Sequence, residues 1–300
     1  MSSMNRNIAS LLPRVLLATG LLAASAVQAT PTLPALNVPA SGVELPGKFT
    51  WFDMATPKPV EQQDFYASLF GWSFRSPGQS DDDYALIVNR GRAIGGMFRH
   101  EPPGGEQDGA LWIALMSVTS VDEAIATTQS SGGAVQVQAA TVPDRGRHAL
   151  LTDPAGAIFG VLDSSTGDPP DYQAEMGDVI WVDLFARDVP GMIRFYSGLA
   201  PYEISTRPIV QDVERNILSA HGMPRAGIVP VDEEANRAAW VPYVRVENVA
   251  ATLEKVVEGG GFAIVAPDER ILNGNVAVFV DPFGGVTGIV KWEYSEDAGQ

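Results

Sequence analysis

The sequence predicts an α+β protein that contains two copies of one unit, each a curved sheet with helices on its outside. One observation is a repeat. A Trp-x-Asp strand followed by a helix with Phe-Tyr at its centre occupies residues 51–66, and it recurs 130 positions later at residues 181–196. The other observation is that strand-like patterns outnumber helical ones within each copy.

Further landmarks recur in the same order and at nearly the same spacing. They are Gly91 and Gly96 with Gly222 and Gly227, Trp112 with Trp240, and the Asp-Pro-x-Gly turns at residues 153–156 and 281–284. The offset between partners drifts only between 128 and 131 positions, which indicates small insertions in the loops. The repeat therefore predicts two homologous domains, at residues 47–165 and 176–294.

The first domain is predicted to contain a strand and a helix, twice, each followed by further strands. Residues 48–55 predict a strand, and residues 59–70 predict a helix whose aromatic side chains form one stripe. Residues 111–118 predict the next strand. The Ser120-x-x-Glu123 pair then predicts a helix start, since these side chains cap the free amides of a first turn.

The second domain repeats this order. Residues 240–246 predict a strand, Asn248 predicts the cap of the next helix, and the glycines at 259–261 predict its end. In both domains the Asp-Pro-x-Gly stretch has proline and glycine where a type I turn needs them, so it predicts a turn between two strands.

Four segments lie outside the domains. Residues 1–29 have the pattern of a signal peptide, because Arg6 and Arg14 precede an apolar run and Val27-Gln28-Ala29 fits a cleavage site after Ala29. A retained membrane anchor is the alternative. The other segments are predicted to be a Pro-rich linker at 30–46, a linker at 166–175 and a tail at 295–300. We therefore expect a secreted or periplasmic protein.

Composition excludes several classes of function. The formal net charge is −16, and loss of two arginines with the signal peptide makes it −18. Such an acidic surface repels phosphate backbones, so nucleic acid is not expected as a partner. Cysteine is absent, which excludes disulfides, thiol nucleophiles and thiolate metal sites.

These residues resemble the vicinal oxygen chelate superfamily, the group of glyoxalases, bleomycin-resistance proteins and extradiol dioxygenases. The resemblance rests on the opening strand, the Phe-Tyr helix with the following Leu-Phe-Gly-Trp, the second strand-helix pair and the Asp-Pro-x-Gly turn. It covers nearly all of residues 47–294. It implies paired βαβββ modules whose sheets curl into a cup, and two such domains that imitate the dimer of single-domain members.

The resemblance also implies where a metal would be held, on inward positions of the first and last strands of each module. Those positions fall on six residues without a suitable donor: Trp51, Trp112, Trp181, Trp240, Gly160 and Gly288. A divalent ion needs nitrogen or oxygen ligands. We therefore expect no metal and no cofactor in either domain.

The same six residues are candidates to line a pocket. Aromatic walls opposite glycines would leave a cavity for a flat apolar or cationic molecule. The alternative is that the tryptophans only fill the core.

Asp53 and Asp183 follow their tryptophans by two positions, so they share a face of the strand. Each is a candidate base or ligand-binding carboxylate, or it fixes a neighbouring loop. His148 is the best of three scattered histidines as a polar pocket residue, and Val276 stands at the equivalent position of the second domain.

The sequence favours an exported protein that binds a small aromatic or apolar molecule without a metal. Two alternatives remain open. One is an enzyme of the same superfamily, a lyase, isomerase or dioxygenase that uses a residual metal or Asp-based acid-base chemistry. The other is a non-catalytic interaction module. We expect a monomer or a weak homo-oligomer, with no membrane span after signal removal.

Overall fold

The computed structural model describes residues 33–77, 84–100, 109–210, 213–232 and 238–294. The predicted signal peptide and tail lie outside these ranges. The first domain contains β1 (Phe49–Thr56), α2 (Pro59–Phe70), β2 (Ser73–Arg75), β3 (Tyr84–Asn89), β4 (Arg92–Arg99), β5 (Leu111–Ser117), α3 (Val121–Ser130), β6 (Ala134–Val142), β7 (Gly146–Thr152) and β8 (Ile158–Ser164).

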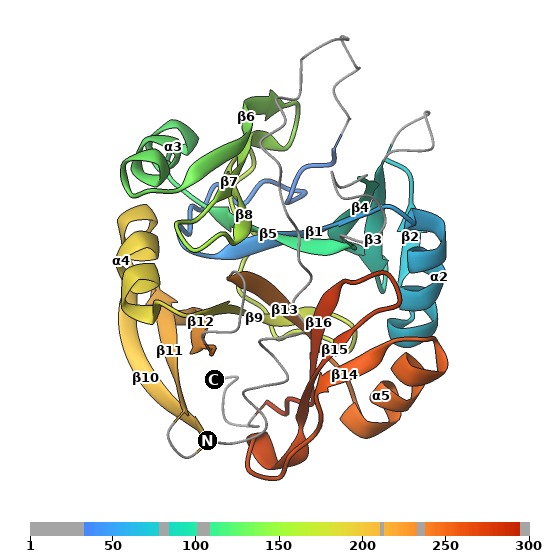
Figure 1. Cartoon of the computed structure of the whole chain (residues 1–300). Coiled ribbons are helices and arrows are strands. Elements are labelled where there is room, and N and C mark those ends of the chain that lie inside the picture. Colours follow the sequence, from blue (N-terminus) through green and yellow to red (C-terminus); the bar gives the residue numbers. More distant parts are fainter. Residues whose placement is uncertain (1–32, 78–83, 101–108, 211–212, 233–237, 295–300) are drawn as a thin grey trace.

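The second domain repeats this order (Figure 1). It contains β9 (Val179–Ala186), α4 (Val189–Leu199), β10 (Glu203–Val210), β11 (Val213–Ala220), β12 (Met223–Pro230), β13 (Ala239–Arg245), α5 (Val249–Glu258), β14 (Phe262–Val265), the 3₁₀ turn η2 (Leu272–Gly274), β15 (Val276–Val280) and β16 (Val286–Val290).

Each domain is one eight-stranded mixed sheet made of two βαβββ modules. The strand orders are β2-β3-β4-β1-β5-β8-β7-β6 and β10-β11-β12-β9-β13-β16-β15-β14. In the first sheet β1 and β5 pair antiparallel at the centre, while β4 runs parallel to β1 and β8 runs parallel to β5. The predicted α+β fold of tandem cup-shaped domains is confirmed.

The helix starts follow the predicted capping chemistry. The Ser120 hydroxyl accepts a hydrogen bond from the Glu123 amide at 3.3 Å, and the Asn248 side chain accepts one from the Ala251 amide at 3.0 Å. Helix α2 starts with Pro59, whose fixed φ suits a first helical turn.

Alternate side chains of the central strands face two different cores. Phe52 and Met54 of β1 belong to one large core that both domains share, whereas Trp51 and Ala55 belong to a smaller cluster on the other face of the first sheet. We call this second face the first cup, and the equivalent face of the second sheet the second cup. The shared core therefore lies between the two sheets, and the cups lie on their far faces.

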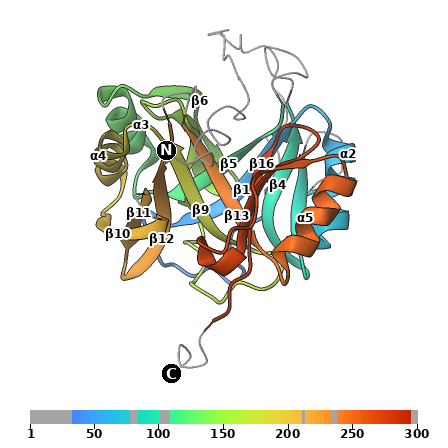
Figure 2. The same cartoon turned by 60° about the horizontal axis from the view of Figure 1, so that its bottom comes forward.

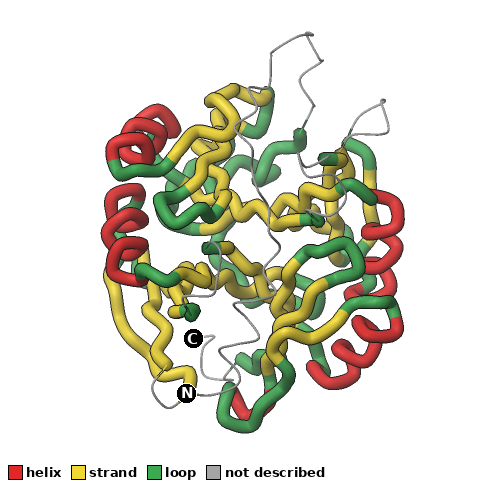
Figure 3. Tube along the Cα trace, viewed as in Figure 1, coloured by secondary structure: helices red, strands yellow, loops and turns green. Residues whose placement is uncertain are grey.

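Helices flank the shared core. Figures 1 and 2 show α3 beside α4 on one side and α2 beside α5 on the other, and both helix pairs are in contact. The tube in Figure 3 shows the strands between these helices. Among the described residues, no helix is long and apolar enough to cross a membrane.

The segments predicted as linkers contain no helix or strand where they are described, but side-chain contacts fasten them. The Asn37 side chain donates to the Gly167 carbonyl at 2.7 Å. Buried Asp168 accepts hydrogen bonds from the Leu45 amide and the Ser117 hydroxyl, both at 2.6 Å. The two connecting segments are thus bound to each other and to the end of β5.

Candidate functional site: the first cup

A Trp-Asp-Tyr cluster lies at the centre of the first cup. The Trp51 indole N–H is 2.8 Å from Asp53 Oδ1 and 3.1 Å from the Tyr84 hydroxyl oxygen. Tyr84, at the start of β3, donates its own hydrogen to Asp53 Oδ1 at 2.7 Å. Period-2 alternation along β1 places Trp51 and Asp53 on one face, as predicted.

A glycine makes room for this cluster. Gly96 of β4 pairs with Asp53 across the sheet. A methyl group on its Cα would lie 1.9 Å from the Tyr84 hydroxyl and 2.5 Å from Asp53 Oδ1. Only the absence of a side chain at this position allows the two polar groups to meet.

Arg145 completes the cluster from the turn between β6 and β7. Its guanidinium carbon lies 3.9 Å from the centroid of the Trp51 ring, which is a cation–π distance. Asp144 adopts a left-handed backbone with φ 63°, and the Arg145 amide donates to the Val142 carbonyl at 3.2 Å. This turn carries Arg145 to the tryptophan.

His148 and apolar side chains surround these groups. His148 is half-buried and follows Gly146 by two residues on β7, and Leu150 of the same strand face packs in the first cup. Leu115 of β5 faces Gly160 of β8, where an added methyl would lie 2.5 Å from Leu115 Cγ. The expected empty volume opposite Gly160 is therefore wrong, because Leu115 fills it.

Burial dominates the electrostatics of the first cup. It raises the pKa of Asp53, although hydrogen bonds from Tyr84 and Trp51 and the charge of Arg145 act in the opposite direction. Burial and the nearby Asp53 charge raise the pKa of Tyr84 well above its usual range. Burial, with a smaller effect from Arg145, lowers the pKa of His148. The imidazole is thus neutral at pH 7.

The second cup repeats the Trp-Asp pair but closes it with different partners. The Trp181 indole donates to Asp183 Oδ1 at 2.7 Å, and Arg215 forms an ion pair with Asp183 Oδ2 at 2.8 Å. Tyr243 is also hydrogen-bonded to Asp183. Asp183 is completely buried, whereas Asp53 remains partly exposed.

Apolar side chains fill the rest of the second cup. An added methyl on Gly288 would lie 2.3 Å from the Tyr243 ring, so the space opposite Gly288 is occupied and not empty as expected. Val276 takes the place of His148, and Ile271, just before η2, joins the same cluster. The two cups therefore differ at the aspartate: Asp53 is partly exposed, whereas Asp183 is buried in an ion pair with Arg215.

The expectation that Trp112 and Trp240 line the cups is wrong. Both lie on the opposite strand face, in the shared core. The Trp112 indole donates to Thr287 Oγ1 at 2.9 Å, and the Trp240 indole donates to the Tyr196 hydroxyl at 2.8 Å. The inward side chains of β5 are instead Ile113 and Leu115. The inward positions predicted for β5 and β13 were wrong by one residue, and a shift of one residue reverses the face of a strand.

The residues of the first cup do not fit a metal ion. Within the described ranges, no group of three or more His, Cys, Asp or Glu side chains comes close enough to hold one. Asp53 Oδ1 already accepts two hydrogen bonds, and the inward position of the last strand is Gly160. A divalent ion needs more oxygen or nitrogen ligands than these positions supply.

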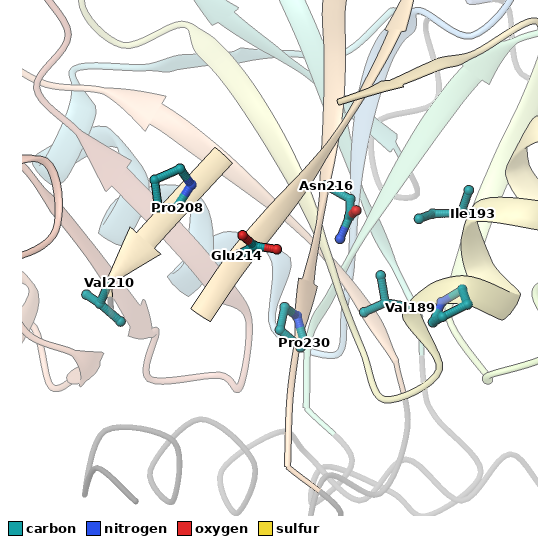
Figure 4. A pocket seen from close by; sticks show the side chains of 8 residues that line it. Val189, Ile193, Pro208, Val210, Glu214, Asn216 and Pro230 are labelled. Atoms are coloured by element: carbon teal, nitrogen blue, oxygen red, sulfur yellow. The ribbon is translucent and has the colours of Figure 1, made fainter. Parts of the chain in front are cut away.

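A separate open pocket of about 780 Å³ lies under α4 on the other face of the second sheet (Figure 4). Its lining is mostly apolar and proline-rich: Val189, Pro190, Ile193, Pro208, Val210, Glu214, Asn216 and Pro230. None of the predicted site residues lines it. It offers one carboxylate and one amide, and no cation.

Sequence reasoning missed Arg145 and did not place Tyr84. Arg145 lies in the turn before β7, where the left-handed backbone of Asp144 interrupts the alternation of a strand. A glycine that recurs in both domains was the sequence feature that could have indicated a side chain packed against Asp53, the place that Tyr84 takes. Gly96 and Gly227 both lie opposite an Asp of the neighbouring strand, which is typical of close side-chain approach.

Residues 50–162 match the family model of the glyoxalase-like domain. CFP32 of Mycobacterium tuberculosis (strain CDC 1551 / Oshkosh), provisionally named a glyoxylase, is 26% identical over 248 residues, which cover 82% of this chain and 95% of CFP32. DauV of Streptomyces sp. (strain C5), named an anthracycline biosynthesis protein, is 28% identical over 264 residues, with coverage of 82% and 94%.

Solved structures share the fold. The Mn(II)-bound glyoxalase from Novosphingobium aromaticivorans aligns with a TM-score of 0.54 at 18% identity, over 86% of this chain and 87% of that one. Homoprotocatechuate 2,3-dioxygenase from Brevibacterium fuscum aligns with a TM-score of 0.56 at 12% identity, over 88% and 86%. The protein thus has the tandem fold of the glyoxalases and extradiol dioxygenases. Its first domain matches the glyoxalase-like domain family, and the likeness of the whole chain to these solved structures is one of fold.

Proposed function

We propose that this protein is exported and binds a small, flat molecule in the first cup without a metal ion. The observation that carries the proposal is the difference between the cups. In the first, Asp53 and Tyr84 are partly exposed beside Trp51, Arg145 and His148. In the second, Asp183 is buried and paired with Arg215. An apolar wall with a few convergent polar groups is the usual character of a small-molecule site.

The side chains of the first cup indicate the kind of ligand. The side chains that pack beside Asp53 are aromatic and apolar, since Trp51, Ile113 and Leu115 belong to one buried cluster. The Streptomyces relative, named for anthracycline biosynthesis, supports a polycyclic aromatic ligand. Binding could be tested by calorimetric titration with 2-naphthamide and anthraquinone-2-carboxamide, which are flat and uncharged.

A matched pair of variants locates the site. Trp51→Leu should abolish binding of either probe, while Trp181→Leu should leave it unchanged, because Trp181 lies in the second cup. Equal losses in both variants, or no binding to the unmodified protein, would overturn the proposal. Near-stoichiometric zinc, nickel, manganese or iron in protein purified without chelator would overturn its metal-free part.

Export is tested separately. Expression of the full chain in a host with two membranes should give a periplasmic protein whose first residue is Thr30. A protein that keeps Met1 and stays in the cytoplasm would contradict export without affecting the binding proposal.

A metal-free acid-base enzyme is the second candidate. Asp53 is partly exposed, and its pKa is raised mainly by burial. A carboxylate of raised pKa at a cup wall can accept a proton from a bound molecule. Turnover of a bound carbonyl compound that disappears in Asp53→Asn but not in Asp183→Asn would favour this candidate.

A further inference from the structure

Within the part of the chain that the structure describes, Arg145 is buried without a hydrogen-bond partner. Its side chain is 2% exposed, and none of its three guanidinium nitrogens has a hydrogen-bond partner in the structure. A guanidinium carries five N–H donors and keeps its charge at neutral pH. Leaving such a group buried and unpaired costs several times more than leaving a neutral group unpaired.

Another buried arginine shows what a structural role looks like in this chain. Arg225 is 9% exposed, forms two hydrogen bonds to Asp171 at 2.5 and 3.0 Å, and donates a third to the Ala220 carbonyl at 3.1 Å. The guanidinium group of Arg225 is thus hydrogen-bonded to a carboxylate. The guanidinium group of Arg145 has no such hydrogen bond among the described residues.

The neighbouring Asp53 does not satisfy Arg145. Its charge acts on the guanidinium through space, but the two groups share no hydrogen bond. Oδ1 of Asp53 is engaged by Trp51 and Tyr84. In the second cup, by contrast, Arg215 already forms an ion pair with Asp183. Of the two arginines beside these aspartates, Arg145 is the one whose guanidinium has no hydrogen-bond partner among the described residues.

We infer that Arg145 is the anion-recognition residue of the first cup, which therefore selects flat aromatic molecules that carry a carboxylate. The aromatic ring of the ligand lies against Ile113 and Leu115, and the ligand's carboxylate accepts hydrogen bonds from two parallel N–H groups of Arg145. Bidentate pairing with a carboxylate is the geometry that a guanidinium fork matches best. The stack on Trp51 holds the fork in place before the ligand arrives. This inference rests on the proposed function.

The test compares each acid with its own amide. Calorimetry at pH 7.5 would measure 2-naphthoate against 2-naphthamide, and anthraquinone-2-carboxylate against anthraquinone-2-carboxamide. The unmodified protein should bind each acid about 10- to 100-fold more tightly than its amide, because a hydrogen-bonded charge pair supplies that difference. Arg145→Met should remove the preference and leave the affinity for the amide within about threefold.

Arg147→Met is the matched control. Arg147 lies two residues further along, in β7, and pairs with Asp122 at 2.7 Å on the protein surface, so its loss should leave the preference unchanged. Arg145→Lys keeps the charge without the fork and should retain only part of the preference. It also replaces Arg145→Met if that variant does not fold.

The outcomes separate the two proposals. If acid and amide bind equally well, or if Arg145→Met weakens both by the same factor, the inference is overturned while small-molecule binding stands. If neither acid nor amide binds to the unmodified protein, the proposed function fails, and the inference fails with it.

Discussion

The Tyr66 hydroxyl of the first domain donates a hydrogen bond to Asp281 Oδ2 of the second domain at 2.8 Å. The equivalent Tyr196 donates to Asp153 Oδ2 of the first domain at 2.9 Å. The Phe-Tyr helix and the Asp-Pro-x-Gly turn are the two landmarks of the repeat, and they meet across the domain boundary in both directions. The repeat therefore maintains a reciprocal interface between the domains.

Each aspartate holds its own turn with the other oxygen. Asp281 Oδ1 accepts from the amides of Phe283 and Gly285 at 2.8 and 2.9 Å, and Asp153 Oδ1 accepts from those of Ala155 and Ala157 at 2.9 and 2.8 Å. One carboxylate thus fixes a local turn and a distant helix together.

Removing the Tyr66 hydroxyl should destabilise the whole protein. Tyr66→Phe takes away one donor to a buried carboxylate, and we expect a loss of about 2 kcal/mol in the free energy of unfolding. Urea unfolding followed by circular dichroism measures it. Tyr172→Phe is the control, because Tyr172 is 51% exposed and its hydroxyl only accepts a hydrogen bond from Arg92 at the surface, so stability should change by less than about 0.5 kcal/mol. Equal effects of the two variants would contradict a role of Tyr66 in the interface.

The same interface should make stability depend on pH. Burial raises the pKa of both Asp153 and Asp281 to about 6. The folded state then holds protons that the unfolded state releases between pH 4 and 6. The stabilisation is fully present below the unfolded pKa, and it is lost as pH rises through about 6.

Lowering the pH from 7.5 to 5.0 should therefore increase the free energy of unfolding, and Asp153 and Asp281 should each contribute on the order of 1 kcal/mol to this increase. Urea unfolding at both pH values measures the change. Asp153→Asn should show a smaller gain on acidification than the unmodified protein, because one of the two titrating groups is gone. A gain of the same size in both proteins would show that Asp153 does not titrate in this range.

Much of the fold could be predicted because local signals and the repeat agree. The Ser120 and Asn248 caps lie where the sequence places them. The sequence could not indicate which side chains of β5 and β13 face the cup. Both faces of these strands are buried, so neither face is marked by polar residues. That is why Trp112 and Trp240 were assigned to the wrong face.

The site was only partly predictable for a different reason. Trp51 and Asp53 share a strand, so period-2 geometry brings them together. Arg145 reaches Trp51 from a turn 94 residues away, and a left-handed Asp144 decides its direction. A sequence pattern carries no information about such a meeting. The partners of Tyr66 and Tyr196 were likewise hidden, because each lies in the other domain.

Equivalent aspartates should respond differently to substitution. Asp183→Asn leaves Arg215 half-buried without its ion pair, so the free energy of unfolding should fall by about 2 kcal/mol while binding of flat aromatic probes is unchanged. Asp53→Asn breaks no ion pair and should cost less stability, but it should alter probe affinity. Urea unfolding and calorimetry on both variants measure the two effects. A large stability loss in Asp53→Asn with unaltered binding would show that Asp53 is structural.

Gly96 should be intolerant of even one methyl group. Gly96→Ala places a carbon 1.9 Å from the Tyr84 hydroxyl, so the ring must move and its bond to Asp53 must break. We expect a loss of about 2 to 3 kcal/mol in the free energy of unfolding and weaker probe binding. Gly198→Ala in α4 is the control. Its added methyl would meet only Thr127 Cγ2 at 3.4 Å, and alanine should stabilise the helix by up to about 1 kcal/mol.

A double-mutant cycle identifies the cause of the Gly96→Ala effect. In a Tyr84→Ala background the two nearest obstacles are gone, and the next nearest is Asp53 Oδ1 at 2.5 Å. The same substitution should then cost about 1 kcal/mol less than in the unmodified protein, since side chains in contact do not act additively. Urea unfolding of the four proteins gives this coupling energy. A cost independent of Tyr84 would mean that the glycine serves the strand pairing of β4 alone, and that the meeting of Tyr84 with Asp53 does not depend on it.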